Sequence, residues 1–189
     1  MIFHPTAIAG AFVIEQERRE DDRGFFARAF CAREFADHGL DPVVVNVNNS
    51  LSAHRGTMRG IHYQLPPKSE AKTIRVLRGS MVDAVVDLRP DSPTFGRYVM
   101  VTLTAEDRRM VHIPKGCANG FMTLEDNTEV MYFVSEYYSP AYERGIRWND
   151  PFFAIPWPLQ PTNITDKDSG HPDFDPARNQ AEIAAAQRG

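Results

Sequence analysis

The segment MVDAVVDLR, residues 81–89, decides the fold class of this chain. The apolar residues at its even positions fall on one face of an extended backbone, and both aspartates fall on the other, which is the period of a β-strand. Further short runs rich in β-branched and aromatic residues, bounded by Gly, Pro, Asn and Asp, are also typical of strands: VVVNVNNS (43–50), TMRGIHYQ (57–64), KTIRVLRG (72–79), YVMVTLT (98–104), RMVHIP (109–114) and TEVMYFVSEYY (128–138). Many short strands with few helices predict an all-β sandwich or small barrel.

Helix signals are few. AREFADHG (32–39) predicts one short helix that ends at Gly39, and AEIAAAQR (181–188) predicts another near the C-terminus, because Ala, Glu and Gln favour helix. The segment from residue 149 to 189 is rich in Pro and Asp but also holds four large apolar side chains between 152 and 157. We therefore expect an ordered tail that covers the barrel, and a single domain spanning 1–189.

Composition narrows the function classes. The chain has 21 basic and 25 acidic residues, a formal net charge of −4, which is not the balance of a nucleic-acid-binding protein. The absence of an apolar run of about 18–20 residues predicts no membrane span. Two cysteines, Cys31 and Cys117, suggest thiols in a reducing compartment, so a cytoplasmic protein is expected.

The stretch TMRGIHYQLPP (57–67) places His62 inside a predicted strand, near Arg59 and Lys72. Three interpretations compete: a hydrogen-bonded core residue, a metal ligand, or a proton carrier. The spacing alone does not decide between a core residue and a proton carrier.

The number of available donors disfavours a metal. No His-x-His pair occurs in the chain, Gln64 stands two residues after His62, and Asn119, in an expected turn over 113–121, occupies a place where a ligand histidine could stand. The other histidines are expected to be solvated, except His112, a core or lining residue: His4, His38, His54 and His171. We predict neither a metal site nor a cofactor.

For proton transfer, His62 needs a carboxylate that orients its ring and balances its charge. Tyr132 and Tyr138 are six residues apart and would share a strand face, so either could serve as an acid, although core packing is the ordinary role of a strand tyrosine. Lys72 and Arg59 could stabilise an oxyanion or phosphate. Arg59 and His62 have opposite parity in a regular strand, so both can face one site only if Gly60 marks a bulge.

Seven segments, taken together and in this order, resemble the dTDP-4-dehydrorhamnose 3,5-epimerase family: DDRGFFARAF (21–30), MRGIHYQ (58–64), AKTIRVLRGSMVDAVVDLRPDSPTFGRY (71–98), IPKGCANGF (113–121), VMYFVSEYYSP (130–140), IRWNDP (146–151) and TDKD (165–168). The resemblance implies a homodimeric, metal-independent, cupin-type jelly roll. It also implies epimerisation of the carbons that flank the C4 ketone of a nucleotide-linked 4-keto-6-deoxy sugar.

The resemblance also implies roles for individual residues. His62 matches the base, Asp168 the carboxylate that orients it, and Tyr132 the acid. Positions that match residues around the sugar and the nucleotide are Arg59, Lys72, Tyr138, Asp83, Arg23, Phe26 and Asn48. Three positions depart from the family pattern, because Arg28 replaces an acid, Asn46 a glutamine and Asn119 a histidine. Arg28 and Asn46 bear on the identity of the nucleotide base, and Asn119 on which carbon is epimerised. A C3-only or C5-only epimerase and a non-catalytic sugar-nucleotide-binding protein remain alternatives.

Overall fold

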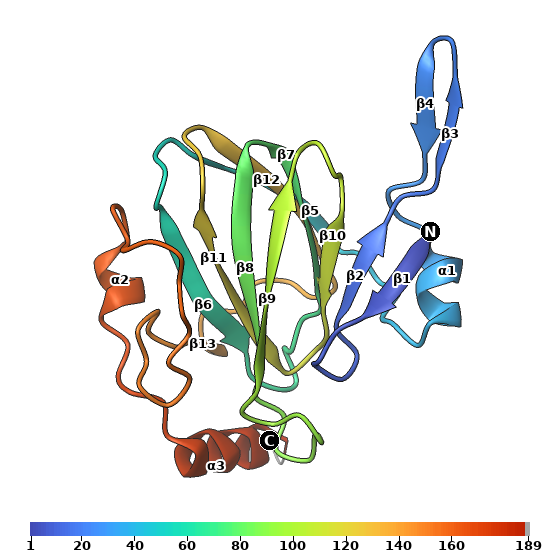
Figure 1. The fold of residues 1–189 in the computed structure, drawn as a ribbon. Helices are drawn as coiled ribbons and strands as arrows, with labels where there is room; N and C mark the ends of the chain where they lie inside the picture. The colour runs from blue at the N-terminus through green and yellow to red at the C-terminus, as the bar shows by residue number, and fades with distance from the viewer. Residues whose placement is uncertain (188–189) are drawn as a thin grey trace.

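Two antiparallel sheets face each other in the computed structural model, which describes residues 1–187 (Figure 1). The six-stranded sheet contains, in spatial order, β1 (Ile2–Pro5), β2 (Phe12–Glu15), β10 (Met110–Ile113), β7 (Lys72–Arg78), β12 (Thr128–Val134) and β5 (Asn46–Ser52). The five-stranded sheet contains β13 (Glu143–Gly145), β6 (Met58–Gln64), β11 (Cys117–Thr123), β8 (Ser80–Asp87) and β9 (Tyr98–Thr104). This architecture confirms the predicted all-β class.

Strand β8 is buried along its whole length, and the alternation of MVDAVVDLR explains why. Val82, Ala84 and Val86 pack on the outer face of the five-stranded sheet, beneath the C-terminal tail. Met81 and Val85 point the other way, into the core between the two sheets. A strand whose two faces are both covered must be apolar on both, so Asp83 and Asp87 need special surroundings.

Asp87 anchors the loop after β8. Its carboxylate accepts hydrogen bonds from Arg89 Nε at 2.8 Å, Ser92 Oγ at 2.5 Å and Thr94 Oγ1 at 2.6 Å. Burial works to raise the pKa of Asp87, but these donors hold it down at about 2. The polar residues of the DLRPDSPTFG segment (87–96) therefore serve to hold this loop in place.

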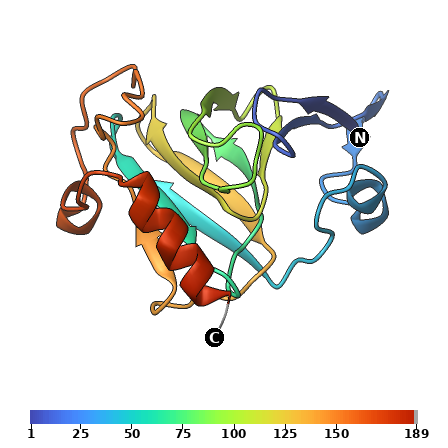
Figure 2. The same ribbon diagram turned by 90° about the horizontal axis from the view of Figure 1, so that it is seen from below.

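The tail packs over the five-stranded sheet. Ile146, Phe153 and Ile155 are buried against the outer faces of β6, β8 and β11. Buried Asp150 holds the tail together by accepting from the backbone N–H groups of Phe152 and Phe174. Figure 2 shows α3 (Pro176–Ala186) lying across the end of this layer. This packing supports the expectation of a single domain.

On the outer face of the six-stranded sheet, α1 (Ala32–Asp37) packs Phe35 against Ile14 and Met110. His112 is buried beneath this helix. Its Nδ1 lies 2.9 Å from Thr73 Oγ1, and burial lowers its pKa to about 4. His112 was expected to be either a core residue or a residue lining a site, and this burial identifies it as a core residue.

Several predicted boundaries were wrong. Strand β12 ends at Val134, well before position 138, and β5 begins at Asn46 rather than 43. The predicted turn over 113–121 is mostly strand β11. Helix α3 begins at Pro176, where Asp175 caps it, because Pro is favoured in the first turn; the predicted end at 188 lies outside the described residues.

The sequence patterns delimited no strand before residue 30. The strands in this region include a hairpin, β3 (Arg18–Asp21) and β4 (Gly24–Ala27), that projects away from the sandwich (Figure 1). Within residues 1–187, no helix is long and apolar enough to cross a membrane.

Candidate active site

A cavity of about 290 Å³ opens between the two sheets. Six of the residues singled out in the sequence line it: Arg59, His62, Lys72, Asn119, Tyr132 and Asp168. They come from both sheets and from the tail, so the cavity exists only when all three layers are assembled.

His62 and Asp168 form a close pair although they are 106 positions apart in the sequence. His62 Nε2 lies 2.7 Å from Asp168 Oδ1, and Gly60 N donates to Asp168 Oδ2 at 3.3 Å. Asp168 lies on the short helix α2 (Asp166–Ser169), whose N-cap Thr165 accepts a hydrogen bond from the Asp168 backbone N–H. Burial works to raise the pKa of Asp168, but His62 and Gly60 lower it below its usual value. The carboxylate therefore stays charged and can stabilise an imidazolium.

Gly60 resolves the parity conflict between Arg59 and His62. On β11, the partners of His62 and Arg59 are two residues apart, Asn119 and Phe121, whereas His62 and Arg59 are three apart on β6. The extra residue on β6 is a bulge, as predicted, and it turns both side chains toward one cavity. Gly60 has a φ of 98°, and a Cβ there would lie 2.8 Å from Asn119 O.

Lys72, Asn119 and Asp83 form a polar chain that runs from the cavity into the core. Lys72 Nζ donates to Asn119 Oδ1 at 3.2 Å, and Asn119 Nδ2 donates to Asp83 Oδ2 at 3.1 Å. Lys72 also lies 3.1 Å from Glu70. Asp83 is fully buried, with Oδ1 unpartnered among the described residues, and burial raises its pKa to about 7. Asn119 therefore lies in a buried strand rather than in a turn, and its side chain links Lys72 to Asp83.

Tyr132 faces the cavity from β12, in the sheet opposite His62. A second cavity of about 250 Å³ adjoins the first and shares His62, Lys72 and Tyr132 with it. Three more predicted site residues line this extension: Asn46, Asn48 and Tyr138.

The placement of Tyr138 on the same strand face as Tyr132 was wrong. Tyr138 lies beyond the end of β12 and is 63% exposed. Its hydroxyl donates to Glu143 Oε2 at 2.8 Å, and this hydrogen bond raises its pKa. In this position Tyr138 borders the mouth of the site, while Tyr132 lies inside it.

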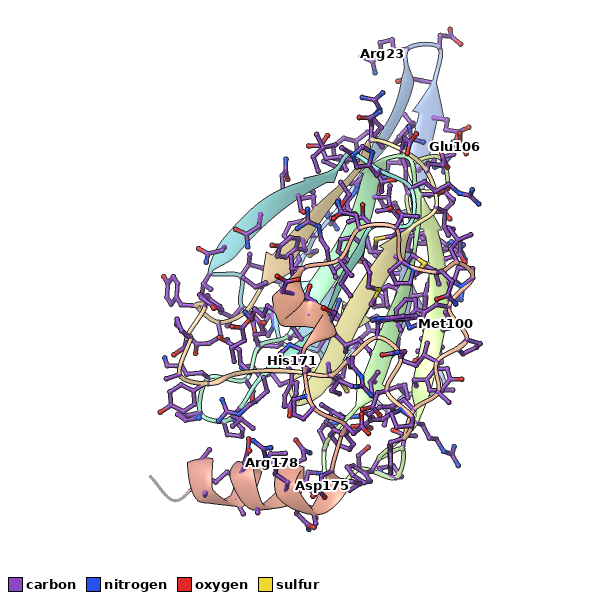
Figure 3. All side chains as sticks on the ribbon, turned by 90° about the vertical axis from the view of Figure 1, so that its left-hand side faces the viewer. Arg23, Met100, Glu106, His171, Asp175 and Arg178 are labelled. Atoms are coloured by element: carbon purple, nitrogen blue, oxygen red, sulfur yellow. The ribbon has the colours of Figure 1, made fainter. Side chains whose placement is uncertain are left out.

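Three predicted substrate-binding residues do not reach either cavity. Arg23 lies at the tip of the β3–β4 hairpin, far from His171 beside α2 (Figure 3), and pairs with Asp21 at 2.5 Å. Phe26 on the same hairpin is 69% exposed, and Arg28 pairs with Glu34 Oε1 at 2.6 Å. Within one chain, residues 1–187 therefore do not bring these side chains to the site.

His171 was wrongly expected to be a solvated surface residue. Its Nε2 is buried and has no hydrogen-bond partner within residues 1–187, and its ring centroid lies 6.3 Å from that of His62. Burial, and then the charge of His62, lower its pKa. Its sequence surroundings, SGHPDFDP, carry only turn signals, and no periodicity could have placed it beside the pair.

Comparisons with known proteins give this arrangement a context. Residues 5–176 match the family model for dTDP-4-dehydrorhamnose 3,5-epimerase. The chain belongs to this family. A relative of that name from Sinorhizobium fredii is 39% identical over 173 residues, covering 91% of this chain and 89% of the relative. The resemblance inferred from the seven segments is thus confirmed.

Solved structures agree with the family assignment. An epimerase of the same name from Bacillus anthracis, with TDP and PPi bound, is 40% identical with a TM-score of 0.87, covering 92% of this chain and 99% of the other. A 3′-monoepimerase from Streptomyces bikiniensis, in complex with dTDP-quinovose, is 34% identical with a TM-score of 0.83, covering 96% and 99%. The fold is therefore the cupin-type jelly roll of an epimerase family, and members of this family are isomerases.

Proposed function

We propose that this protein epimerises a nucleotide-linked 4-keto-6-deoxy sugar, as a 3,5-epimerase of the dTDP-4-dehydro-6-deoxy-D-glucose type. One observation carries the proposal: His62, paired with Asp168, and Tyr132 line one cavity from opposite sheets. Epimerisation needs a base on one face of the carbon and an acid on the other, and this arrangement supplies both.

The first step removes a proton from a carbon next to the C4 ketone. Nε2 of His62 is hydrogen-bonded to Asp168, which leaves Nδ1 of the same ring to accept the proton. The C–H bond breaks, its electron pair forms the enolate C=C bond, and the negative charge moves to O4. The charged Asp168 stabilises the imidazolium that results.

The enolate oxygen needs positive charge close by. Lys72 and Arg59 line the cavity, and both are held by other groups before substrate arrives. Asn119 and Glu70 fix Lys72, and Arg59 Nε donates to Ser52 Oγ at 3.1 Å. Cations oriented in advance stabilise a developing oxyanion without reorganisation during the reaction.

The second step returns a proton to the opposite face of the carbon. We assign this to Tyr132, whose hydroxyl would donate while O4 reforms the ketone. Because His62 can also return its own proton, exchange with solvent and inversion are separable events. A mono-epimerase remains the second candidate, and the similarity to the 3′-monoepimerase favours the C3-only form over the C5-only form.

We propose that a second copy of the chain completes the nucleotide site. Arg23 and Phe26 match nucleotide-holding positions of the family, yet they project on a hairpin away from their own cavity. The outer faces of β5 and β7 also expose apolar side chains, with Val47 at 53%, Leu51 at 57% and Leu77 at 37%. A homodimer would cover these surfaces and carry each hairpin to the partner's cavity. The free thiols of Cys31 and Cys117 support a reducing, cytoplasmic setting.

The chemistry is tested by incubating the protein with dTDP-4-keto-6-deoxyglucose in D2O and measuring deuterium at C3 and C5. Label at both carbons is expected, and label at one carbon identifies a mono-epimerase. His62→Ala should abolish exchange, whereas Tyr132→Phe should retain exchange and impair inversion. His54→Ala, an exposed histidine outside the cavity, is the matched control.

Two outcomes would contradict the assignment. Normal exchange by His62→Ala would exclude His62 as the base, and no exchange by the wild type with dTDP-, UDP-, CDP- or GDP-linked sugars would favour a non-catalytic binding protein. Affinities for the four nucleoside diphosphates, measured alongside, test the effect of Arg28 and Asn46 on base recognition.

Complementation tests the shared site. Arg23→Ala and His62→Ala proteins, each inactive alone, are unfolded together and refolded as a 1:1 mixture. If the hairpin serves the partner, about a quarter of wild-type activity returns, because half of the dimers are mixed and each mixed dimer has one complete site. Recovery of no activity, or a monomeric wild type by light scattering, would contradict the homodimer.

A further inference from the structure

Three donors of the kinds that bind zinc meet at the edge of the active site. They are the ring nitrogens of His62 and His171 and a carboxylate oxygen of Asp168, and all lie within 4.8 Å of one another. His62 comes from β6, Asp168 from α2 and His171 from the segment just after α2. Two of the three are the proposed base and its carboxylate, whereas no role in epimerisation has been derived for His171.

His171 is held against this pair rather than left in solvent. Its Nε2 is buried and unpartnered in the described chain, packed over Gly145, the residue that pairs with His62 across β13 and β6. A Cβ on Gly145 would overlap the imidazole, so the absence of a side chain there makes room for the ring. A buried imidazole nitrogen without a partner can still form a hydrogen bond or bind a metal ion.

The donor set suits Zn²⁺ better than hard cations. Two imidazoles and one carboxylate are ordinary zinc ligands, and imidazole nitrogens do not favour Mg²⁺ or Ca²⁺. Zn–N and Zn–O bonds of about 2.0–2.2 Å place tetrahedral ligand atoms roughly 3.3–3.5 Å apart. The 2.7 Å contact between His62 and Asp168 would open slightly, and His171 would close toward them.

We propose that His62, Asp168 and His171 form an inhibitory zinc site, in which the metal replaces the proton shared by His62 and Asp168 and that proton moves to Nδ1 of the His62 ring. Zinc bound there occupies the ring nitrogen through which Asp168 orients His62. With Nδ1 protonated, the ring has no lone pair left to accept the substrate proton, so the base is blocked. The binding of zinc stands on the geometry alone, and its inhibitory effect rests on the proposed function.

Metal-stripped full-length protein titrated with Zn²⁺, in competition with a chromogenic chelator, tests the binding. The wild type should bind one zinc per chain, and His171→Ala should weaken this binding at least about 10- to 100-fold, the range already seen when only supporting groups of a metal site are lost. His171→Phe fills the same space without a donor and should behave alike. His54→Ala is the control for a histidine elsewhere, and Mg²⁺ is the control for an unsuited metal.

A second readout reports on the ligands directly. Co²⁺ bound by the wild type should give the visible absorption of a tetrahedral site, and this absorption should be lost in His171→Phe. Equal zinc affinity of the wild type and both His171 variants, with thermal melting showing all three folded, would overturn the site.

Inhibition is measured separately. Zn²⁺ should slow solvent exchange by the wild type, a chelator should restore the rate, and the His171 variants should resist at the same zinc concentration, each compared with its own zinc-free rate. Zinc that binds the wild type without slowing it would overturn the inhibitory role. If the protein epimerises no sugar, the titration and the cobalt spectrum still decide the site.

Discussion

Asp83→Asn replaces a fully buried carboxyl by an amide of nearly the same shape, and it should change how stability depends on pH. Burial raises the pKa of Asp83 from 3.8 to about 7. Between these values the unfolded chain releases the proton while the folded chain keeps it, so the free energy of unfolding falls as pH rises through this window. A pKa difference of about 3 corresponds to a total loss of about 4 kcal/mol, at roughly 1.4 kcal/mol per pKa unit.

The assay is urea unfolding of both proteins at pH 5 and at pH 8. About two pKa units of the window lie above pH 5, so the wild type should lose about 3 kcal/mol from this residue between the two pH values. Asp83→Asn carries no titrating group, so its loss should be smaller than that of the wild type by this amount. Other titrating groups are common to both proteins and cancel in the comparison.

Asp91→Asn, an exposed carboxyl in the loop after β8, is the matched control and should follow the wild type. Parallel stability profiles for the wild type and Asp83→Asn would refute the reasoning, because they would mean that the folded protein accommodates the Asp83 charge as well as water does.

Two further predictions concern the bulge at Gly60 and the buried His112. Gly60→Ala should lower the free energy of unfolding, measured in urea, by about 2–4 kcal/mol, because the new Cβ would lie 2.8 Å from Asn119 O. The control is Gly39→Ala, which has a positive φ but open space around it and should lower the free energy of unfolding by only about 1 kcal/mol. Equal losses in the two variants would contradict the steric argument. His112→Gln should make the protein less sensitive to acid. The pKa of His112 in the folded state is about 4, because the charged ring is disfavoured in the core. His112 should therefore cost the wild type about 3 kcal/mol of its free energy of unfolding as the pH falls from 6.5 to 4. An unchanged acid profile in the variant would show that His112 is not the residue responsible.

The parts of the structure that follow from local periodicity could be predicted from the sequence. The alternation in residues 81–89 predicted a strand with two different faces, and the packing of Val82 and Val85 in separate cores confirms it. The parity conflict between Arg59 and His62 required a bulge or kink at Gly60 if both were to face one cavity, and the register of β6 on β11 shows that it is a bulge.

Features that depend on contacts distant in sequence were predicted poorly. Asn119 looked like a turn residue because Gly116 and Gly120 lie on either side of it, but pairing with both β6 and β8 makes it a central strand residue. The hairpin before residue 30 pairs a charged strand, RRED, with GFFA, and both strands are largely exposed, so it carries no pattern of burial. His171 approaches His62 only because the tail docks, and no local signal in the sequence describes docking.

The tail has a consequence for the newborn chain. Every strand of the sandwich, β13 included, is synthesised by residue 145, yet the carboxylate that orients His62 arrives only with α2, at Asp168. A chain interrupted between these points holds every strand of the sandwich but lacks the Asp168 partner of His62. Pairing of His62 with Asp168 therefore requires that synthesis has passed residue 168, well inside the tail.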